Sequence, residues 1–238
     1  MLDRFQEEHV PHIGKRTQKD YGYHIRALRK HFGERVAADI ERKDIERFLD
    51  VPRGRIQRVR MKSVLSSAFT YGVERGIVKF NPCRDVEVVK AQRRERYVTD
   101  EEFEGVKKMA SPNVRLAMDL ARLTGQKQSK VLSLCWSQVD FEHKIIRFRN
   151  ERIRTDPSRQ RVELLITPEL QAVLEECRIL AKKKRTTHVI VNEDGDPYTT
   201  TGFRPNFQRL MRTKWKPAGH DGFRFQDLQT TWERDRQI

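Results

Sequence analysis

Hydrophobic residues in the first half of the chain recur every three or four positions, and glycine or proline interrupts the pattern. This period predicts α-helices at residues 17–32, 42–49 and 55–76. Thr17 followed by Asp20 predicts a capping box at the start of the first helix, and Gly33 and Gly76 predict helix ends. Asn81-Pro82 ends this part, so we expect a wholly helical first half.

The second half mixes the helical period with a period of two. Thr99 and Glu102 predict one capped helix, and apolar spacing predicts further helices at 114–123, 129–134, 168–184 and 203–214. Alternation predicts three strands at 144–150, 160–166 and 188–192, with turns at Asp156-Pro157 and Gly195-Asp196-Pro197. The predicted fold class is therefore mainly α with a small antiparallel β-sheet (α+β).

A polar segment separates the two halves. Residues 90–96, KAQRRER, contain no aliphatic residue except Ala91, which is typical of an exposed linker. We place a helical domain at 1–89, a basic linker at 90–96 and a second domain at 97–238. The linker either contacts nucleic acid or is a plain hinge.

Charge then indicates the class of partner. The 238 residues include 49 Lys and Arg against 34 Asp and Glu, a formal net charge of +15, and the mean hydropathy is −0.80. Residues 1–100 hold 23 basic and 15 acidic residues (+8), and residues 101–238 hold 26 and 19 (+7). Such an excess favours a polyanion, most commonly nucleic acid; an ordinary basic protein is the alternative.

Two basic stretches supply candidate DNA-binding residues. Residues 51–70 contain no acid, and Arg55, Arg58 and Lys62 fall on one face of the predicted helix, away from its apolar stripe. Contact with phosphates is one interpretation of this row, and a solvated face is the other. The candidates in the two stretches are Arg53, Arg55, Arg58, Arg60, Lys62, Arg93, Arg94 and Arg96.

Cysteine and membrane patterns add little. Cys83, Cys135 and Cys177 form no CxxC pair and no metal-ligand spacing with histidine, so we expect buried free thiols and no metal or small-molecule cofactor. The first ten residues have no apolar signal core, and no run approaches membrane length. A soluble cytoplasmic protein is expected.

Several motifs occur in a characteristic order over residues 1–232. They are Thr17-x-x-x-Tyr21, Phe32-Gly33, Asp44-Ile45, Leu65-Ser66-x-Ala68-x-x-Tyr71-Gly72-x-x-Arg75-Gly76, Asn81-Pro82, Leu123-Thr124-Gly125, Leu132-Ser133-Leu134, Trp136-x-x-Val139-Asp140 and Phe223-Arg224-Phe225-x-Asp227-Leu228. In this order and spacing the chain resembles the tyrosine recombinases, or phage integrases.

The resemblance implies a helical core-binding domain followed by a catalytic domain. Members of the family cut and rejoin DNA through a covalent tyrosine phosphate, in site-specific recombination and integration. It implies double-stranded DNA as partner, a homo-oligomer or other recombinase subunits on that DNA, and a bacterial, prophage setting. Two arginines, a lysine and a histidine serve the scissile phosphate in such enzymes, because charge develops on its oxygens.

This sequence departs from the family at these positions. Lys127 stands where the first arginine is expected, Gln226 where the histidine is, and Gln229 where the second arginine is. Arg154 best matches the lysine, with Arg152 as the other candidate. Lys127 is also a candidate DNA-binding residue. None of the five tyrosines is placed like the nucleophile, and we expect a catalytic-like domain that lacks its C-terminal part.

Three interpretations follow from these departures. The first is a DNA-binding protein that holds duplex without cutting it. The second is a recombinase that remains active with divergent residues and a tyrosine supplied in trans. The third is a non-functional prophage remnant, in which the missing helices would leave apolar surface exposed near Leu210, Phe223 and Leu228.

Overall fold

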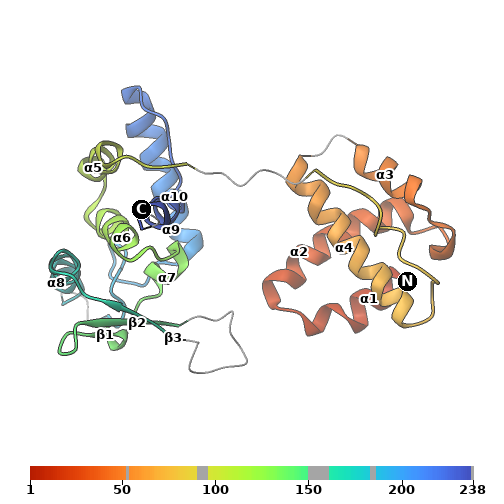
Figure 1. Ribbon diagram of the computed structural model, residues 1–238, viewed down its shortest axis with the longest axis horizontal. Helices are drawn as coiled ribbons and strands as arrows, with labels where there is room; N and C mark the ends of the chain where they lie inside the picture. Colours follow the sequence, from red (N-terminus) through yellow and green to blue (C-terminus); the bar gives the residue numbers. More distant parts are fainter. Residues whose placement is uncertain (52–53, 90–95, 150–160, 183–185, 237–238) are drawn as a thin grey trace. The chain divides into compact units, whose positions relative to one another are not determined.

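The computed structural model describes the chain except for residues 52–53, 90–95, 150–160, 183–185 and 237–238. The chain divides into two compact units, residues 1–93 and 94–238. The predicted linker lies almost entirely outside the described residues, so its bounds stay a prediction. The predicted class is confirmed: both units are mainly helical, and the second contains one small antiparallel sheet (Figure 1).

The N-terminal unit is a helical bundle built around one long helix. Its α-helices are α1 (Leu2–Glu8), α2 (Lys15–Phe32), α3 (Arg42–Asp50) and α4 (Arg55–Glu74). The helix α4 packs against the other three and is buried on several sides. The core is aromatic and aliphatic, with Phe5, Ile25, Leu28, Ile45 and Phe69 fully buried.

Helix starts and ends in this unit follow local hydrogen bonds. The helix α2 begins at Lys15 with Gly14 as its N-cap, so the expected Thr17 cap is wrong. The Gln18 amide donates to the Ile13 carbonyl oxygen at 2.8 Å and ties the first turn of α2 to the residue before its N-cap. Gly76 ends the segment after α4 with a φ of +66°, a conformation that glycine adopts without the penalty of a Cβ.

Within its described residues, the C-terminal unit contains six α-helices beside the sheet. They are α5 (Asp100–Met109), α6 (Pro112–Thr124), α7 (Gln128–Leu132), α8 (Pro168–Lys182), α9 (Thr200–Leu210) and α10 (Asp227–Asp235). The predicted capping box of α5 is present, with the Glu102 N–H donating to Thr99 Oγ1 at 3.2 Å. The central helix α6 packs against α8 and α10, and a π-helical turn, Met211–Trp215, extends α9.

The sheet differs from the prediction in one strand. It consists of β1 (Val139–Asp140), β2 (Ile145–Arg149) and β3 (Arg161–Leu165), antiparallel in that order. The expected strand at 188–192 is wrong: it makes only isolated bridges, and the Val189 N–H donates to the Leu134 carbonyl oxygen at 2.9 Å. A short run buried on all sides has no period that separates a strand from buried coil. The Asp156-Pro157 turn lies outside the described residues.

The apolar surface expected of a remnant is not observed. Leu210, Phe223 and Leu228 are only 8%, 4% and 0% exposed, because α9 and the segment before α10 pack into the core of the C-terminal unit. That expectation is therefore wrong. None of the helices in the described residues has the length and apolar character needed to cross a membrane.

The helix α10 is fastened to the beginning of its unit. The Val98 N–H donates to Thr231 Oγ1 and the Tyr97 hydroxyl donates to Asp235, both at 2.9 Å. Arg122 on α6 bridges the two segments, with 3.2 Å to the Val98 carbonyl oxygen and 3.4 Å to the Asp235 carboxylate. The first residues after the linker are thus held by the last described helix.

Candidate nucleic-acid interface

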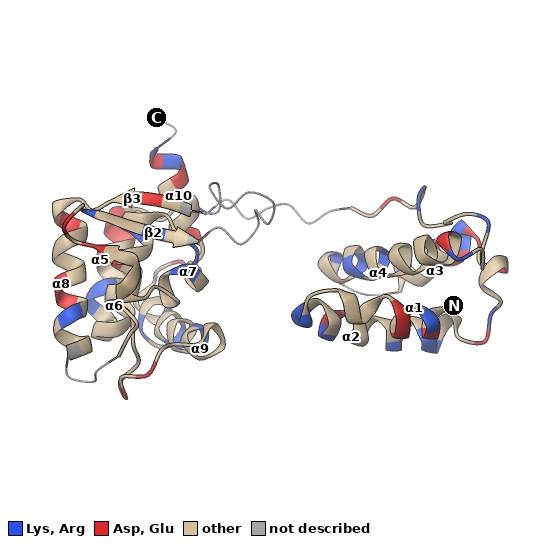
Figure 2. Cartoon of the chain, turned by 90° about the horizontal axis from the view of Figure 1, so that it is seen from below, with Lys and Arg blue, Asp and Glu red and all other residues tan. Residues whose placement is uncertain are grey.

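Lys and Arg positions lie along α4 in the N-terminal unit and along α7 and α9 in the C-terminal unit, as well as on other helices (Figure 2). On α4, Arg55 is exposed, whereas Arg58 and Lys62 are half-buried. The Nε atom of Arg58 is buried and has no hydrogen-bond partner. We expected this row to lie on the face away from the apolar stripe. Arg55 is exposed as expected, whereas part of the Arg58 side chain is buried.

Two other predicted basic residues, Arg60 and Arg96, interact with groups outside this row. Burial and then the charge of Arg60 lower the pKa of His24 on α2. Arg96 forms an ion pair with Glu102 and donates to the Tyr97 carbonyl oxygen at 2.8 Å. Arg53, Arg93 and Arg94 lie outside the described residues, so their role stays a prediction.

We call Lys127, which stands where the resemblance places the first arginine, the first catalytic box, and Gln226 with Gln229 the second box. The first box lies between two helices. Lys127 is the N-cap of α7 and is exposed. Gly125, just before it, ends α6 with a φ of +63°. The Thr124 hydroxyl donates to the Leu120 carbonyl oxygen and accepts from the Gln126 N–H, which fixes the start of this loop. Arg152 and Arg154, the candidates for the lysine position, lie outside the described residues.

The second box lies at the start of α10. Gln226 is the N-cap of this helix and is exposed. The buried Asp227 carboxylate accepts the Arg224 N–H at 2.8 Å and shapes the turn that presents both Arg224 and Gln226. Gln229 is half-buried, and its amide donates to Glu233 at 2.8 Å. Neither glutamine carries charge or titrates.

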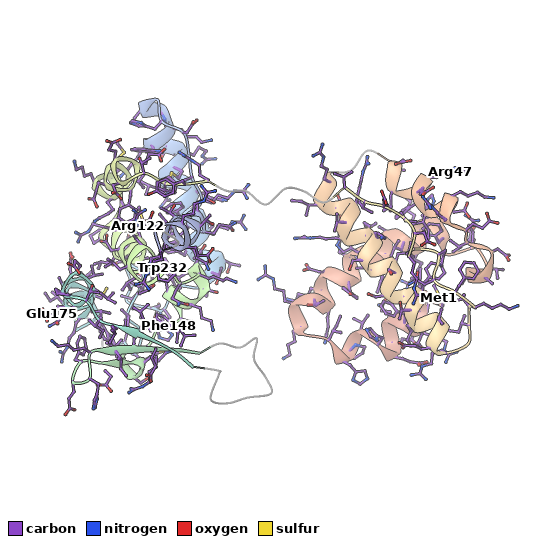
Figure 3. The ribbon with its side chains drawn as sticks, in the orientation of Figure 1. Met1, Arg47, Arg122, Phe148, Glu175 and Trp232 are labelled. Atoms are coloured by element: carbon purple, nitrogen blue, oxygen red, sulfur yellow. The ribbon has the colours of Figure 1, made fainter. Side chains whose placement is uncertain are left out.

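The fold brings the two boxes together. The indole of Trp232, from α10, lies directly over Gly125, among the helices of the C-terminal unit (Figure 3). Gln128, the residue after Lys127, and Gln226 line one pocket. Residues about a hundred positions apart in the sequence therefore meet at one site.

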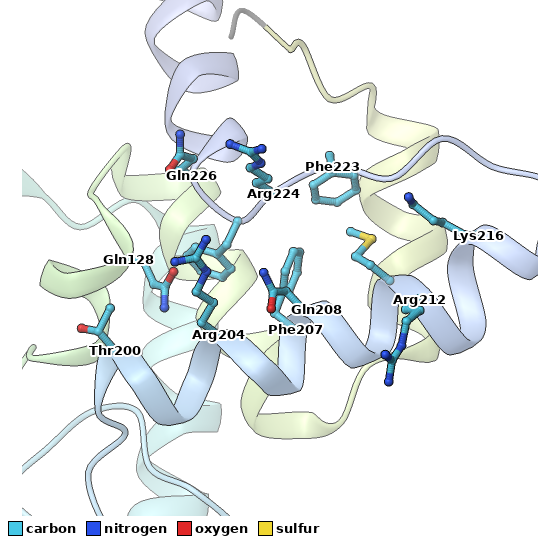
Figure 4. A pocket seen from close by; sticks show the side chains of 12 residues that line it. Gln128, Thr200, Arg204, Phe207, Gln208, Arg212, Lys216, Phe223, Arg224 and Gln226 are labelled. Atoms are coloured by element: carbon cyan, nitrogen blue, oxygen red, sulfur yellow. The ribbon is translucent and has the colours of Figure 1, made fainter. Parts of the chain in front are cut away.

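That pocket has a volume of about 450 Å³ and lies between α9, the start of α7 and the segment before α10 (Figure 4). Its charged lining residues are all cations, namely Arg204, Arg212, Lys216 and Arg224. All four are exposed, and within the described ranges none has a carboxylate partner. The pocket is therefore a concentrated positive site, which we name the cationic pocket.

Three of these four cations were missed by the motif search although the sequence contains a signal for them. Residues 197–220 hold five Lys and Arg and no Asp or Glu, the same excess as residues 51–70. Arg204, Gln208 and Arg212 recur every four positions, which puts them on one side of a helix. Arg224 was quoted only as part of a family motif.

The tyrosines are all described, and none of them lines the cationic pocket. Tyr21, Tyr23 and Tyr71 belong to the N-terminal unit. A hydrogen bond to Asp235 and then burial raise the pKa of Tyr97, and burial raises the pKa of Tyr198. Each shift keeps the phenol protonated.

No metal site is found among the described residues, where no three His, Cys, Asp or Glu side chains gather. Cys83 and Cys177 are buried, and desolvation raises the pKa of each thiol to about 12. Such thiols are inert packing groups. Cys135 is only partly buried, so the expectation of buried thiols fails for it.

Known proteins similar to this chain are phage integrases. The chain is 30% identical over 137 residues to the integrase of Escherichia phage HK022, and this match covers 55% of the chain and 38% of that integrase. It is 27% identical over 145 residues to the integrase of Enterobacteria phage 434, and this match covers 58% of the chain and 41% of that integrase. The matched part thus spans about two fifths of these relatives. No protein-family model matches the chain.

Solved structures of similar fold extend over both units. A lambda integrase dimer bound to a COC′ core site covers 100% of this chain and 69% of that one, with a TM-score of 0.77 at 20% identity. A lambda integrase tetramer bound to a Holliday junction covers 100% and 70%, with a TM-score of 0.79 at 20% identity. The Tn1549 transposon integrase in complex with circular intermediate DNA matches over 97% of this chain and 83% of that one, with a TM-score of 0.74 at 13% identity. The chain is therefore similar to phage integrases in sequence over part of their length, and it has the same fold as solved integrases.

Proposed function

We propose that this protein holds duplex DNA in the manner of an integrase but does not cut or rejoin it. One observation carries the proposal: the cationic pocket beside the second box gathers four cations, while the box itself presents Gln226 and Gln229. The site keeps cations that attract phosphate, but the histidine and arginine that would support strand cleavage are replaced by glutamines.

Attraction for DNA is supported by charge and by relatives. The net charge of +15 is divided between both units, so each can contact the phosphate backbone. The solved integrases of similar fold are bound to DNA as a dimer and as a tetramer. We extend both properties to this chain, and expect it to bind duplex with other copies of itself or with recombinase subunits.

Loss of strand cleavage follows from the chemistry of phosphoryl transfer. Negative charge spreads over the phosphate oxygens in the transition state, and guanidinium forks aimed there stabilise it. Lys127 retains a charge but not the planar fork, and Gln229 retains neither. Loss of one such donor costs on the order of 3–4 kcal/mol, and Gln226 has no proton to give a leaving oxygen at neutral pH.

An active enzyme is the second candidate, and one observation favours it. Arg204 and Arg224 line the same pocket as Gln226, so guanidinium groups are present near the second box although not at the family's positions. They would have to replace Lys127 and Gln229 in neutralising the phosphate. A tyrosine would have to come from outside the pocket, because none of the described tyrosines lines it.

The experiment uses two DNA substrates and the full chain. A gel shift with duplex DNA tests binding, and a duplex with a nick beside the cleavage point traps any covalent adduct. We expect a shifted complex and no slowly migrating covalent band on a denaturing gel. A covalent band assigned by mass spectrometry to one of the five tyrosines would refute the non-cutting proposal, and absence of any shift at low salt would refute DNA binding.

A further inference from the structure

The cationic pocket contains features that a binding site for phosphate alone does not need. Its wall toward the core consists of Phe207, Met211, Phe223 and Phe225, each less than 7% exposed. Phe207 contacts Phe225 edge to face, with ring centroids 5.5 Å apart, and Phe223 at 5.9 Å. Such interlocked rings form a rigid apolar floor under the exposed cations.

Amide groups complete the lining. Gln128, Gln208 and Gln226 all border the pocket, from three different segments. The Nε2 atom of Gln128 is buried and has no hydrogen-bond partner among the described residues. A buried donor left unpaired costs about 1–3 kcal/mol, so an acceptor brought by a ligand would remove a cost that the free protein bears.

These features match the parts of one nucleotide. Guanidinium and ammonium groups bind phosphate, an aromatic floor stacks with or packs against a flat base, and a glutamine amide pairs with the edge of a base, most often adenine. Pockets of 300–1,000 Å³ suit ligands of this general size. A base that is paired and stacked in a duplex cannot enter a closed pocket, so the nucleotide has to be unpaired.

We propose that the cationic pocket binds one unpaired nucleotide of the DNA, with its base on the phenylalanine floor and its phosphate beside Arg204 and Arg224. The inference rests on the proposed function, because the protein must first hold DNA. Gln128 donates its buried Nε2–H to an acceptor on the base. The chemistry recognised is that of a nucleoside monophosphate unit, which DNA or a free nucleotide could supply.

The test compares two duplexes of one sequence, one fully paired and one with a single unpaired adenine nucleotide as a bulge. Fluorescence anisotropy gives both affinities for the full chain. We expect at least a tenfold preference for the bulged duplex. Gln128→Leu removes the amide, Arg224→Gln removes an exposed cation, and each should reduce the preference to less than threefold.

Arg209→Gln is the matched control. Arg209 is an exposed cation on α9, and its side chain contacts Asn206 rather than the pocket. This variant should keep the preference. If Gln128→Leu fails to fold, as judged by circular dichroism, Arg224→Gln alone decides, because its side chain is exposed.

The outcomes separate the two proposals. Equal affinity for paired and bulged duplexes refutes the nucleotide pocket and leaves duplex binding standing, whereas binding to neither duplex refutes the proposed function. Free dAMP at millimolar concentration should compete for the pocket and lower the affinity for the bulged duplex to that for the paired duplex, but no further. Direct binding of dAMP tighter than that of the bulged duplex would overturn DNA as the source of the nucleotide.

Discussion

The indole ring of Trp232 occupies the space in which any residue other than glycine at position 125 would put its Cβ. A Cβ built on Gly125 would lie 2.2 Å from Cδ2 of Trp232. The loop that carries Lys127 is thereby pressed against the helix that carries Gln226 and Gln229. Backbone and ring together determine how the two catalytic-box segments meet.

Gly125→Ala should therefore destabilise the C-terminal unit for two separable reasons. The left-handed φ of +63° costs a residue with a Cβ about 1–2 kcal/mol, and the overlap with the indole adds about 1–3 kcal/mol. Urea unfolding followed by circular dichroism measures the sum.

Trp232→Ala in the same background tests the division. In the Trp232→Ala background, Gly125→Ala should lower the free energy of unfolding only by the backbone contribution, because the ring that overlaps the new Cβ is gone. The effect of Trp232→Ala alone is measured separately and subtracted. Additive effects of the two substitutions would show that ring and loop are not in contact.

Charge reversal on α4 should affect two arginines differently. Arg55→Glu is expected to weaken duplex binding with no change in the free energy of unfolding, because Arg55 is exposed. Arg58→Glu should lower both the affinity for duplex and the free energy of unfolding. The Nε atom of Arg58 is buried, and a carboxylate at that place is poorly solvated. Gel shifts and urea titrations on both variants check this, and equal loss of stability would contradict the assignment.

Salt should weaken duplex binding steeply. Each phosphate that the protein neutralises contributes a slope of about −0.9 to the plot of log affinity against log salt concentration. Arg55→Gln should make the slope shallower by about one contact. Anisotropy titrations at four salt concentrations measure this, and a flat dependence in the unsubstituted protein would exclude an interface built on phosphates.

Stability of the N-terminal unit should decrease as the pH falls below neutrality. His24 is 5% exposed, its Nδ1 lies 3.0 Å from the sulfur of Met61, and burial and Arg60 lower its pKa. The unfolded chain therefore binds a proton at His24 more readily than the folded chain, so stability is lost from about pH 6.5 downwards.

His24→Leu removes this group and should flatten the dependence. Melting temperatures at pH 7.5 and 5.5 for both proteins give the comparison. Asp44, whose pKa the Arg35 hydrogen bond lowers to about 2, titrates below this window and does not interfere. An identical decrease of the melting temperature in both proteins between pH 7.5 and 5.5 would show that His24 is not the responsible group.

Local chemistry made much of the fold predictable. The Thr99 and Glu102 capping box and the glycine ends at Gly33 and Gly76 are local signals, and the structure contains each of them. The strand expected at 188–192 failed because burial by distant segments, not local alternation, determines its conformation. Thr17 failed as a cap because α2 begins before it, at Lys15 with Gly14 as its N-cap.

The site was predictable only where a family motif marks it. Lys127, Gln226 and Gln229 were located from their order in the sequence, and the structure brings the neighbourhoods of Lys127 and Gln226 to one pocket. The pocket's composition depends on how α9 packs under the segment before α10, which no periodicity specifies. The basic run that holds Arg204, Arg212 and Lys216 is visible in the sequence, but only the structure places these residues at the pocket.

The fastening of Tyr97 and Val98 to α10 has a mechanical consequence. A displacement of residue 96 would strain first the hydrogen bonds that Val98 and Tyr97 make to Thr231 and Asp235 of α10. Gln226, the N-cap of the same helix, lines the cationic pocket, so α10 joins the entry of the C-terminal unit to that pocket.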